Sequence, residues 1–213
     1  MAQAPALLRC GGSELQVPGT VEEGFLAAKE PASAIGAPLI MKALPESRMI
    51  FLIRDPRDVA ASSLDAHKEG SWFYEQRKRK GRVGQHEAPL AGEQLNAQVR
   101  RNATTYLSQI EKARQAYETH EGPKVLLKYE DLRLDTLSEM KRMHFTLGIP
   151  VDGEELKRVV EKHSWENIPR DKKGEGKFYR KGTPGSWRED LTPEQVEIVE
   201  NITAPLIERY YSG

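Results

Sequence analysis

The sequence predicts an α/β fold in which helices flank a central parallel sheet. Two short, almost wholly apolar runs, at 48–53 (RMIFLI) and 124–128 (KVLLK), have the length of buried parallel strands. Between them, from Glu93 to His120, apolar residues recur every three or four positions, which predicts a long amphipathic helix. Strands that alternate with helices are typical of layered α/β domains. A chain of 213 residues fits one such domain, and we expect a single domain over 1–213.

The first strand is predicted to lead directly into a helix. Asp55 can cap that helix and Pro56 suits its first position, so we expect a strand–helix unit over residues 48–67. Upstream of this unit, residues 33–44 favour a short helix. Residues 1–24 are rich in glycine, alanine and proline and are predicted to be irregular.

Irregular and helical segments follow this unit. Residues 68–92 are polar and contain glycine, which predicts a long excursion rather than a core element. Thr136 and Glu139 form a capping-box pattern that opens a helix ending near Gly148. A further amphipathic helix is expected over residues 154–163.

The C-terminal part of the chain predicts a long loop followed by a helix. Residues 164–190 contain glycine and basic residues without a hydrophobic period, which is typical of a functional loop. Thr192 and Gln195 form a second capping-box pattern, so the last helix is expected to run to about Tyr210.

Composition narrows the classes of partner. Lysine plus arginine equals aspartate plus glutamate, at 32 each, so no net field favours nucleic acid or an anionic membrane. The apolar runs are far shorter than a membrane span, and the N-terminal segment lacks the apolar core of a secretory signal. The single cysteine, Cys10, and the absence of metal-ligand spacing predict no metal and a reducing, cytoplasmic location.

Arg54 marks a first candidate anion site. It follows the first predicted strand, and open α/β sheets bind ligands at the carboxyl ends of their strands. The N–H groups and dipole of the next helix point to the same place. Ser62, about two turns into that helix, can add a hydroxyl donor. The alternative is that Arg54 pairs with a neighbouring carboxylate while Ser62 faces solvent.

A second candidate site is the segment 180–187 (RKGTPGSW). Arg180 and Lys181 precede two glycines, the first of which is Gly182. The backbone of such a loop can approach an oxyanion closely and donate N–H groups to it. Trp187 is expected to anchor the end of the loop in the core. The alternative is a solvated turn before a helix.

Together these segments resemble the sulfotransferase family that uses 3′-phosphoadenosine-5′-phosphosulfate (PAPS) as donor. Arg54 and Ser62 match the family's strand-end arginine and the serine eight positions later, which bind the 3′-phosphate of the donor. The segment 180–187 matches its C-terminal Arg-Lys-Gly motif with the closing tryptophan. The resemblance extends over about residues 48–210 and implies a P-loop-NTPase-like sulfotransferase fold.

Further residues follow from the resemblance. Tyr129, in a Tyr-Glu-Asp segment after the second strand, matches a tyrosine that lies near the adenine. Trp165 ends a polar-aromatic segment that corresponds to one in contact with the adenine ring. The implied nucleotide site comprises Arg54, Ser62, Tyr129, Trp165, Arg180, Lys181 and Gly182.

The resemblance also suggests catalytic residues. Lys29 and Glu30 precede the first strand where some relatives have Lys-Asp-Pro. Sulfuryl transfer needs a cation for the leaving group and a base for the acceptor. Lys29 is assigned to the first role and Glu30 is a candidate for the second. The alternative is a solvated Lys–Glu pair at a helix start.

One part of the family pattern has no counterpart. The strand and Ser/Thr/Gly-rich turn that hold the 5′-phosphosulfate are not found, so we expect an N-terminally truncated sulfotransferase. It would transfer a sulfuryl group from PAPS, leaving 3′-phosphoadenosine 5′-phosphate (PAP), to a hydroxyl or amine of a small-molecule or carbohydrate acceptor. The alternative is a catalytically inactive PAP/PAPS-binding or scaffolding module. A P-loop kinase is disfavoured because G-x-x-x-x-G-K-[ST] does not occur. The acceptor and the oligomeric state stay open.

Overall fold

The computed structural model describes residues 25, 27–29, 34–81 and 91–212. Contacts divide the chain into two units, Met1–Pro31 and Ala32–Gly213. The described residues of the first unit are exposed and form neither helix nor strand. The predictions for residues 1–24 and for Glu30 lie outside the described residues.

A parallel pair of strands forms the sheet of the second unit. Strand β1 (Met49–Ile53) pairs with β2 (Lys124–Lys128) in a register that places Ile53 opposite Lys128. Both strands therefore end at the same edge. This confirms the two predicted strands and their parallel arrangement, and among the described residues the sheet has only these two.

The described residues cover strand β1 on one face only, although its apolar run predicted burial on both. Phe51 and Ile53 are buried, at 3% and 1% exposed, whereas Ile50 and Leu52 are 48% and 50% exposed. This alternation is what a pleated strand shows when helices cover one of its faces.

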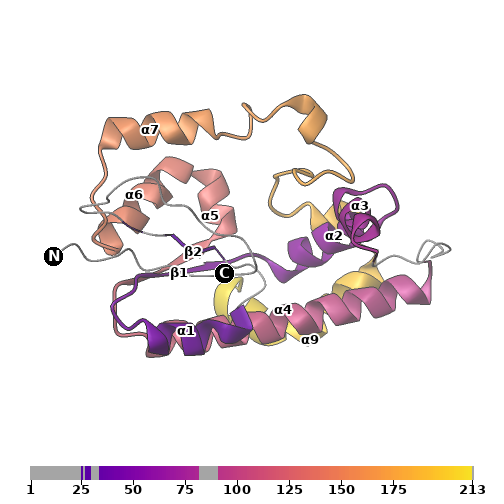
Figure 1. Ribbon diagram of the computed structural model, residues 1–213. Coiled ribbons are helices and arrows are strands. Elements are labelled where there is room, and N and C mark those ends of the chain that lie inside the picture. The colour runs from indigo at the N-terminus through magenta and orange to yellow at the C-terminus, as the bar shows by residue number, and fades with distance from the viewer. Residues whose placement is uncertain (1–24, 26, 30–33, 82–90, 213) are drawn as a thin grey trace. The chain divides into compact units, whose positions relative to one another are not determined.

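Helices make up most of the second unit (Figure 1). A short 3₁₀ segment, Ala34–Gly36, precedes α1, and a second one is Arg170–Lys172. The α-helices are α1 (Ala37–Ala43), α2 (Pro56–His67), α3 (Trp72–Arg79), α4 (Glu93–Thr119), α5 (Tyr129–Leu134), α6 (Thr136–Thr146), α7 (Gly153–Lys162), α8 (Trp187–Asp190) and α9 (Pro193–Tyr210). Among the described residues, no helix is both long and apolar enough to cross a membrane.

Two predicted helix starts are confirmed. The Asp55 carboxylate accepts the Arg57 N–H at 2.8 Å and caps α2. Thr192 and Gln195 form the reciprocal capping box of α9, with both of its hydrogen bonds present. These short-range signals fix where α2 and α9 begin.

Three short helices were not predicted, and one of them is α8, which lies at the end of the loop expected over residues 164–190. Helix α3 lies within the segment expected to be an excursion, where Ser71 caps it by accepting the Tyr74 N–H at 3.2 Å. Arginine and lysine in its last turn complement the helix dipole. None of its residues is buried, so it stays outside the core. Another unpredicted helix is α5, which begins directly after β2.

The predicted cap of α6 was wrong by one residue. Asp135, not Thr136, is the N-cap, and its carboxylate accepts the Ser138 N–H at 3.0 Å. Thr136 instead donates its hydroxyl to the Leu132 carbonyl at 2.6 Å. A carboxylate immediately before a threonine competes for the cap because both side chains can accept an N–H bond.

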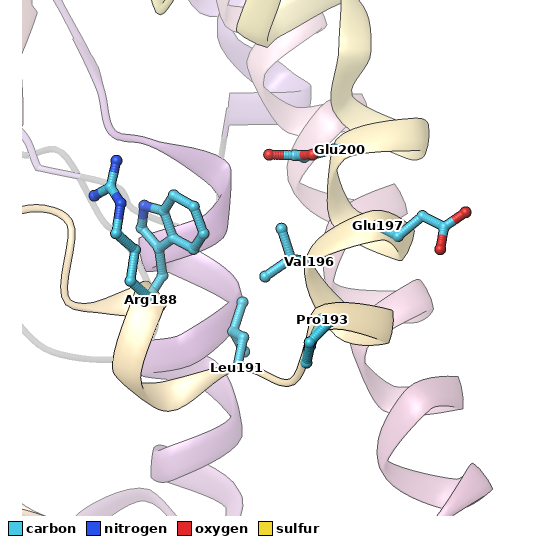
Figure 2. Close-up of a pocket in the computed structure, with 7 residues that line it drawn as sticks. Arg188, Leu191, Pro193, Val196, Glu197 and Glu200 are labelled. Atoms are coloured by element: carbon cyan, nitrogen blue, oxygen red, sulfur yellow. The ribbon is translucent and has the colours of Figure 1, made fainter.

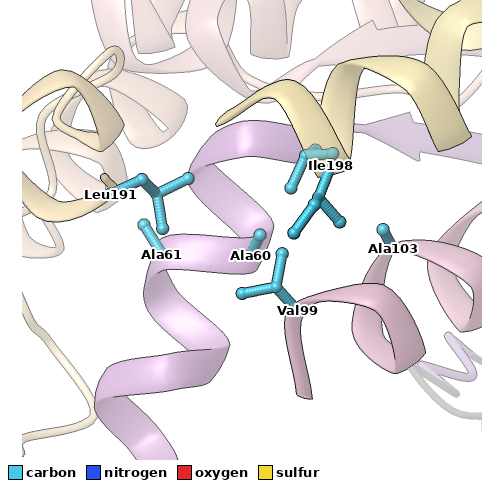
Figure 3. Close-up of a cluster of buried hydrophobic side chains, with 7 residues drawn as sticks. Ala60, Ala61, Val99, Ala103, Leu191 and Ile198 are labelled. Atoms are coloured by element: carbon cyan, nitrogen blue, oxygen red, sulfur yellow. The ribbon is translucent and has the colours of Figure 1, made fainter. Parts of the chain in front are cut away.

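Helices α2, α4 and α9 enclose the largest buried cluster (Figure 3). The small side chains of Ala60 and Ala61 on α2 and Ala103 on α4 let these helices approach closely. Larger side chains fill the remaining space, namely Val99, Leu191, Ile198 and Val199. This packing fixes α2 as a rigid support behind the candidate site.

Two further clusters fix the strands. On β1, Phe51 and Ile53 pack against Ile110 and Ala113 of α4 and against Leu206 of α9. Those two long helices run side by side below the strands in Figure 1. On β2, the buried side chains pack against α6, in a cluster made of Val125, Leu127, Met143 and Leu147.

Candidate functional site

The site begins where the two strands end. Strand β1 leads through Arg54 and Asp55 into α2, and β2 leads directly into α5 at Tyr129. The guanidinium carbon of Arg54 lies 4.4 Å from the centroid of the Tyr129 ring, which is a cation–π contact. The structure thus brings together two residues that the sequence assigned to the nucleotide site.

The backbone of Arg54 is held by Tyr106 of α4. The Tyr106 hydroxyl accepts the Arg54 N–H at 3.1 Å and donates to the Arg54 carbonyl at 2.7 Å. Burial raises the pKa of the Tyr106 hydroxyl above its ordinary value, so the hydroxyl keeps the proton that this second bond needs. Sequence reasoning missed this role, because the apolar period that predicts the helix gives no signal for a hydroxyl that bonds a distant strand end.

The next peptide is held by α5. A Glu130 carboxylate oxygen accepts the Asp55 N–H at 2.9 Å, and the Tyr211 hydroxyl donates to the other oxygen at 3.3 Å. Burial, together with the nearby negative charge of Glu130, raises the pKa of Tyr211. The turn between β1 and α2 is therefore fixed from both the α5 side and the C-terminal side.

The Arg54 side chain retains an unused donor. Its Nε is buried and has no hydrogen-bond partner among the described residues. Within the same residues, no carboxylate forms an ion pair with Arg54, so the alternative of a neighbouring partner is not what the structure shows. A buried N–H without a partner is costly, and an oxygen of a bound anion would satisfy it.

Ser62, the second predicted ligand of this segment, lies in the second half of α2 and is half-buried. Its hydroxyl forms no hydrogen bond with a described residue. The structure shows no contact between Ser62 and Arg54, so a shared phosphate stays a prediction.

The cations of the second segment are already paired. Arg180 forms a short ion pair with Asp190, and its other terminal nitrogen donates to the Ser186 hydroxyl at 3.1 Å. Lys181 Nζ lies 2.9 Å from Asp190 and 3.0 Å from Glu189. The Arg180 side chain is only 9% exposed.

The protonation of this group follows from those bonds. Burial alone would raise the pKa of the Asp190 carboxyl, but the hydrogen bonds from Arg180 and Lys181 hold it below its ordinary value. The hydrogen bond to Asp190, followed by that to Glu189, raises the pKa of Lys181. Asp190 and Lys181 are therefore both charged at neutral pH.

Gly182 and Trp165, both predicted, lie in contact. Gly182 has a φ of +65°, and a Cβ at this position would lie 2.6 Å from the Trp165 ring. Arg133 of α5 donates to the Gly182 carbonyl at 2.8 Å, and its guanidinium lies 5.5 Å from the Trp165 ring centroid. Arg133 was not predicted. Its spacing of one helical turn after Tyr129 could have indicated it, had α5 been predicted.

The predicted catalytic pair cannot be placed at this site. Lys29 is exposed and belongs to the first unit, while Glu30 lies outside the described residues. Their assigned roles stay predictions.

A separate hollow of about 450 Å³ lies between α8 and the start of α9 (Figure 2). In that view Leu191 and Val196 flank it and Glu200 points inward. It includes none of the predicted nucleotide ligands, and its two carboxylates disfavour a phosphate. Its lining residues are Trp187, Arg188, Leu191, Pro193, Val196, Glu197 and Glu200.

Fold and site together describe an α/β domain with a basic, aromatic-lined site at the carboxyl ends of parallel strands. Residues 26–210 match the sulfotransferase domain family. The chain belongs to this family, as the sequence motifs indicated.

Curated relatives agree with the family. The chain is 26% identical over 185 residues to cytosolic sulfotransferase 17 of Arabidopsis thaliana, which covers 75% of this chain and 51% of the relative. A flavonol sulfotransferase-like protein of Flaveria bidentis is 29% identical over 94 residues, covering 37% of this chain and 30% of the relative. The chain thus spans about half the length of the first relative and a smaller share of the second.

Solved structures agree with the fold. Mouse sulfotransferase SULT7A1 complexed with PAP has a TM-score of 0.52 at 16% identity, covering 82% of this chain and 62% of that one. Retinol dehydratase in a complex with retinol and PAP has a TM-score of 0.50 at 21% identity, covering 80% and 50%. The predicted sulfotransferase fold is confirmed.

Proposed function

We propose that this chain binds PAPS and PAP and belongs to an enzyme that transfers the sulfuryl group of PAPS to a hydroxyl or amine. The observation that carries the proposal is Arg54 at the carboxyl end of β1, whose buried Nε has no hydrogen-bond partner in the described part of the chain. The family and the two PAP-bound neighbours support the choice of this nucleotide as the anion.

The 3′-phosphate is assigned to Arg54. A guanidinium offers planar, paired donors that match a phosphate, and its stacking on Tyr129 restricts its rotation. The N-terminus of α2 adds a favourable dipole at the same place. Ser62 is proposed as a hydroxyl ligand further along α2.

The adenine is assigned to the aromatic residues beside the strand ends. Tyr129 begins α5, and Trp165 lies in the segment after α7. Arg133, four residues after Tyr129 on α5, lies over the Trp165 ring. Lys173 lies 5.0 Å from the Trp165 ring centroid. Aromatic rings and guanidinium planes are the groups on which bases stack. Arg180, Lys181 and Gly182 complete the proposed nucleotide site.

The transfer itself needs two further roles. The acceptor oxygen or nitrogen forms a bond to sulfur while the bond from sulfur to the 5′-phosphate oxygen breaks, so that PAP leaves with the bonding pair. Lys29 is proposed to stabilise that charge and Glu30 to receive the acceptor proton. No metal is included in this proposal.

The acceptor is proposed to be a small molecule with an apolar body. Retinol in one neighbouring structure and the flavonol in the name of one relative support this class. Trp72 and Phe178, with ring centroids 5.2 Å apart, form an exposed aromatic pair that could contact it. A carbohydrate acceptor has no comparable support. The name of the first relative supports a cytoplasmic location.

Calorimetry with PAP, followed by transfer assays with labelled PAPS and a panel of alcohols, phenols and carbohydrates, tests the proposal. We expect PAP to bind much more tightly than adenosine 5′-phosphate, because only PAP presents the 3′-phosphate to Arg54. Equal binding of the two nucleotides would contradict the assignment. Binding of PAP without transfer to any acceptor would favour an inactive nucleotide-binding module.

A further inference from the structure

Two buried carboxylates hold the loop of the second basic segment on α2. Asp58 and Asp65 are 0% and 6% exposed. They lie about two turns apart on one face of α2. Each accepts backbone N–H groups from the segment 174–187, which runs beside α2 (orange in Figure 1). The sequence analysis assigned neither Asp58 nor Asp65 to the site.

Asp58 holds the end of that segment. One of its oxygens accepts the Gly185 N–H at 2.7 Å, and the other accepts the Trp187 N–H at 3.1 Å. The Ser186 hydroxyl lies 3.5 Å from this second oxygen. Three consecutive residues of the loop therefore converge on one carboxylate.

The environment of Asp58 makes these bonds necessary. Among the described residues, no lysine, arginine or histidine forms an ion pair with this buried carboxylate. Burying a charge is costly, and here the loop N–H groups and the first-turn position in α2 offset that cost. Release of the loop would remove the bonds, so burial of Asp58 and docking of the loop depend on each other.

Asp65 holds the beginning of the segment. It accepts the Gly176 N–H at 2.9 Å, and the Gly176 carbonyl accepts the Trp72 N–H at 2.8 Å. Lys68 lies 3.2 Å from the same carboxylate. Gly176 has a φ of +70°, which a side chain would strain, so the chain can turn here towards α2.

Arg180–Gly182 lies between these two anchors. From the other side, Arg133 of α5 donates to the Gly182 carbonyl at 2.8 Å. The loop is thus bonded to both helices that continue the two parallel strands. Because α2 also follows Arg54 directly, one packed element supports the phosphate-binding arginine and both loop anchors.

We propose that Asp58 and Asp65 are positioning residues of the nucleotide site. They keep Arg180–Gly182 docked beside α5, where this segment can act on the same nucleotide as Arg54. They touch the loop rather than the nucleotide, so they act through the residues that they hold. The inference rests on the proposed function for the identity of the ligand.

Hydrogen exchange of the whole chain tests the anchoring without any nucleotide. Asp58→Asn replaces one acceptor oxygen by an NH₂ group and should speed exchange over residues 183–188 about tenfold or more. Asp65→Asn should do the same over residues 174–178. The matched control is Asp152→Asn, because Asp152 accepts the Glu155 N–H at 2.7 Å as the cap of α7. Among the residues that the structure describes, α7 forms no hydrogen bond or ion pair with this loop. The control should leave both segments unchanged.

Nucleotide binding tests the positioning. In this proposal the docked Arg180–Gly182 segment contacts the 3′-phosphate together with Arg54. Asp58→Asn should therefore weaken PAP about tenfold and adenosine 5′-phosphate, which lacks that phosphate, by about twofold or less. A purely structural role would weaken both nucleotides by the same factor, and that result would overturn the proposal. Unchanged exchange over 183–188 would overturn it as well.

If Asp58→Asn does not fold, Asp65→Asn tests the same proposal. Faster exchange over 174–178 with a loss specific to PAP supports the proposal, and unchanged exchange there contradicts it. A wild-type chain that does not bind PAP would refute the proposed function, whereas the exchange data would still decide whether the two carboxylates anchor the loop.

Discussion

The two basic segments of the site differ in what their cations contact. Arg54 stacks on Tyr129, and its buried Nε has no partner among the described residues. Arg180 and Lys181 instead pair with Asp190, a carboxylate supplied by the chain itself. In the sequence both segments looked alike, as cations beside backbone donors. The difference shows that a basic residue of a nucleotide-binding motif can already be paired with a carboxylate of the same chain.

This difference has an energetic consequence. A phosphate that binds Arg54 gains a charge-assisted bond without displacing a protein group. A phosphate that binds Arg180 or Lys181 must compete with Asp190, or share the remaining donors of these side chains. We therefore expect Arg54 to affect mainly nucleotide affinity and Arg180 to affect stability as well as affinity.

The largest expected effect is on stability. Arg180→Ala removes the partner of Asp190 from a pair whose side chains are 9% and 21% exposed. We expect a loss of about 3 kcal/mol, the low end of the range for a buried pair, because Lys181 still pairs with Asp190. For a chain of this size that is a fall in Tm of roughly 6–12 °C, measurable by calorimetry or circular dichroism.

The double variant Arg180→Ala/Asp190→Ala is the control for this cause. It removes both charges, so it should be more stable than Arg180→Ala if an unpaired carboxylate is responsible. A single variant as stable as the wild type would show that the pair contributes nothing to folding and would remove the contrast between the segments.

Arg54→Ala should have the next largest effect, on affinity. Loss of a charge-assisted bond to the 3′-phosphate corresponds to about 1.5–3 kcal/mol, or roughly ten- to a hundredfold weaker PAP binding in calorimetry. Its Tm should change little, because Arg54 forms no ion pair with the described residues. The PAP affinity of Arg54→Lys should lie between those of the wild type and of Arg54→Ala, since lysine keeps the charge but not the planar guanidinium. Wild-type affinity in Arg54→Ala would refute the assignment.

Much of the fold could be predicted because its signals are local. The apolar period of Glu93–Thr119, the two short strands and the capping box of Thr192 each involve residues close in the chain. The unpredicted helices α3, α5 and α8 are short, and none of them carries a buried residue. Without an apolar face directed to a core, periodicity gives no signal for such helices.

The candidate site could be predicted only in part, because many of its contacts join residues that are far apart in the sequence. Arg54, Tyr129, Gly182 and Trp165 were assigned through motifs, and the structure places them in contacting pairs. The hydrogen bond that the Gly185 N–H donates to Asp58 joins residues far apart in sequence, and no local pattern indicates it. Which carboxylate a basic side chain pairs with also depends on tertiary packing, so the sequence does not predict it.

Asp190→Asn sharpens the comparison by removing the competing charge. Asparagine keeps one acceptor for Arg180 but no longer neutralises Lys181, so a phosphate would meet two cations with less competition. We expect PAP to bind about three- to tenfold more tightly in calorimetry at low salt. Weaker binding would show instead that Asp190 orients the cations for the nucleotide.

Asp190 also makes the free energy of unfolding depend on pH in a defined direction. The folded-state pKa of Asp190 lies below its ordinary value of 3.8, because its hydrogen bonds to Arg180 and Lys181 outweigh the effect of burial. Its contribution is therefore complete above 3.8 and is lost as the pH falls through the lower folded-state value. Urea unfolding of the wild type and of Asp190→Asn should differ at pH 7 and converge in acid. A constant difference at all pH values would contradict this linkage.

The smallest expected effect comes from Glu189, the other carboxylate beside Lys181. Its side chain is 78% exposed and its partner's is 37% exposed, so water and salt screen the pair at 3.0 Å. Glu189→Gln should therefore change PAP affinity and Tm only slightly, by about twofold or less in affinity. Because Glu189 and Asp190 are neighbours with the same partner, the two substitutions differ chiefly in burial. An effect of Glu189→Gln as large as that of Asp190→Asn would mean that total charge near Lys181, rather than the buried bond to Arg180, determines how the segment meets an anion.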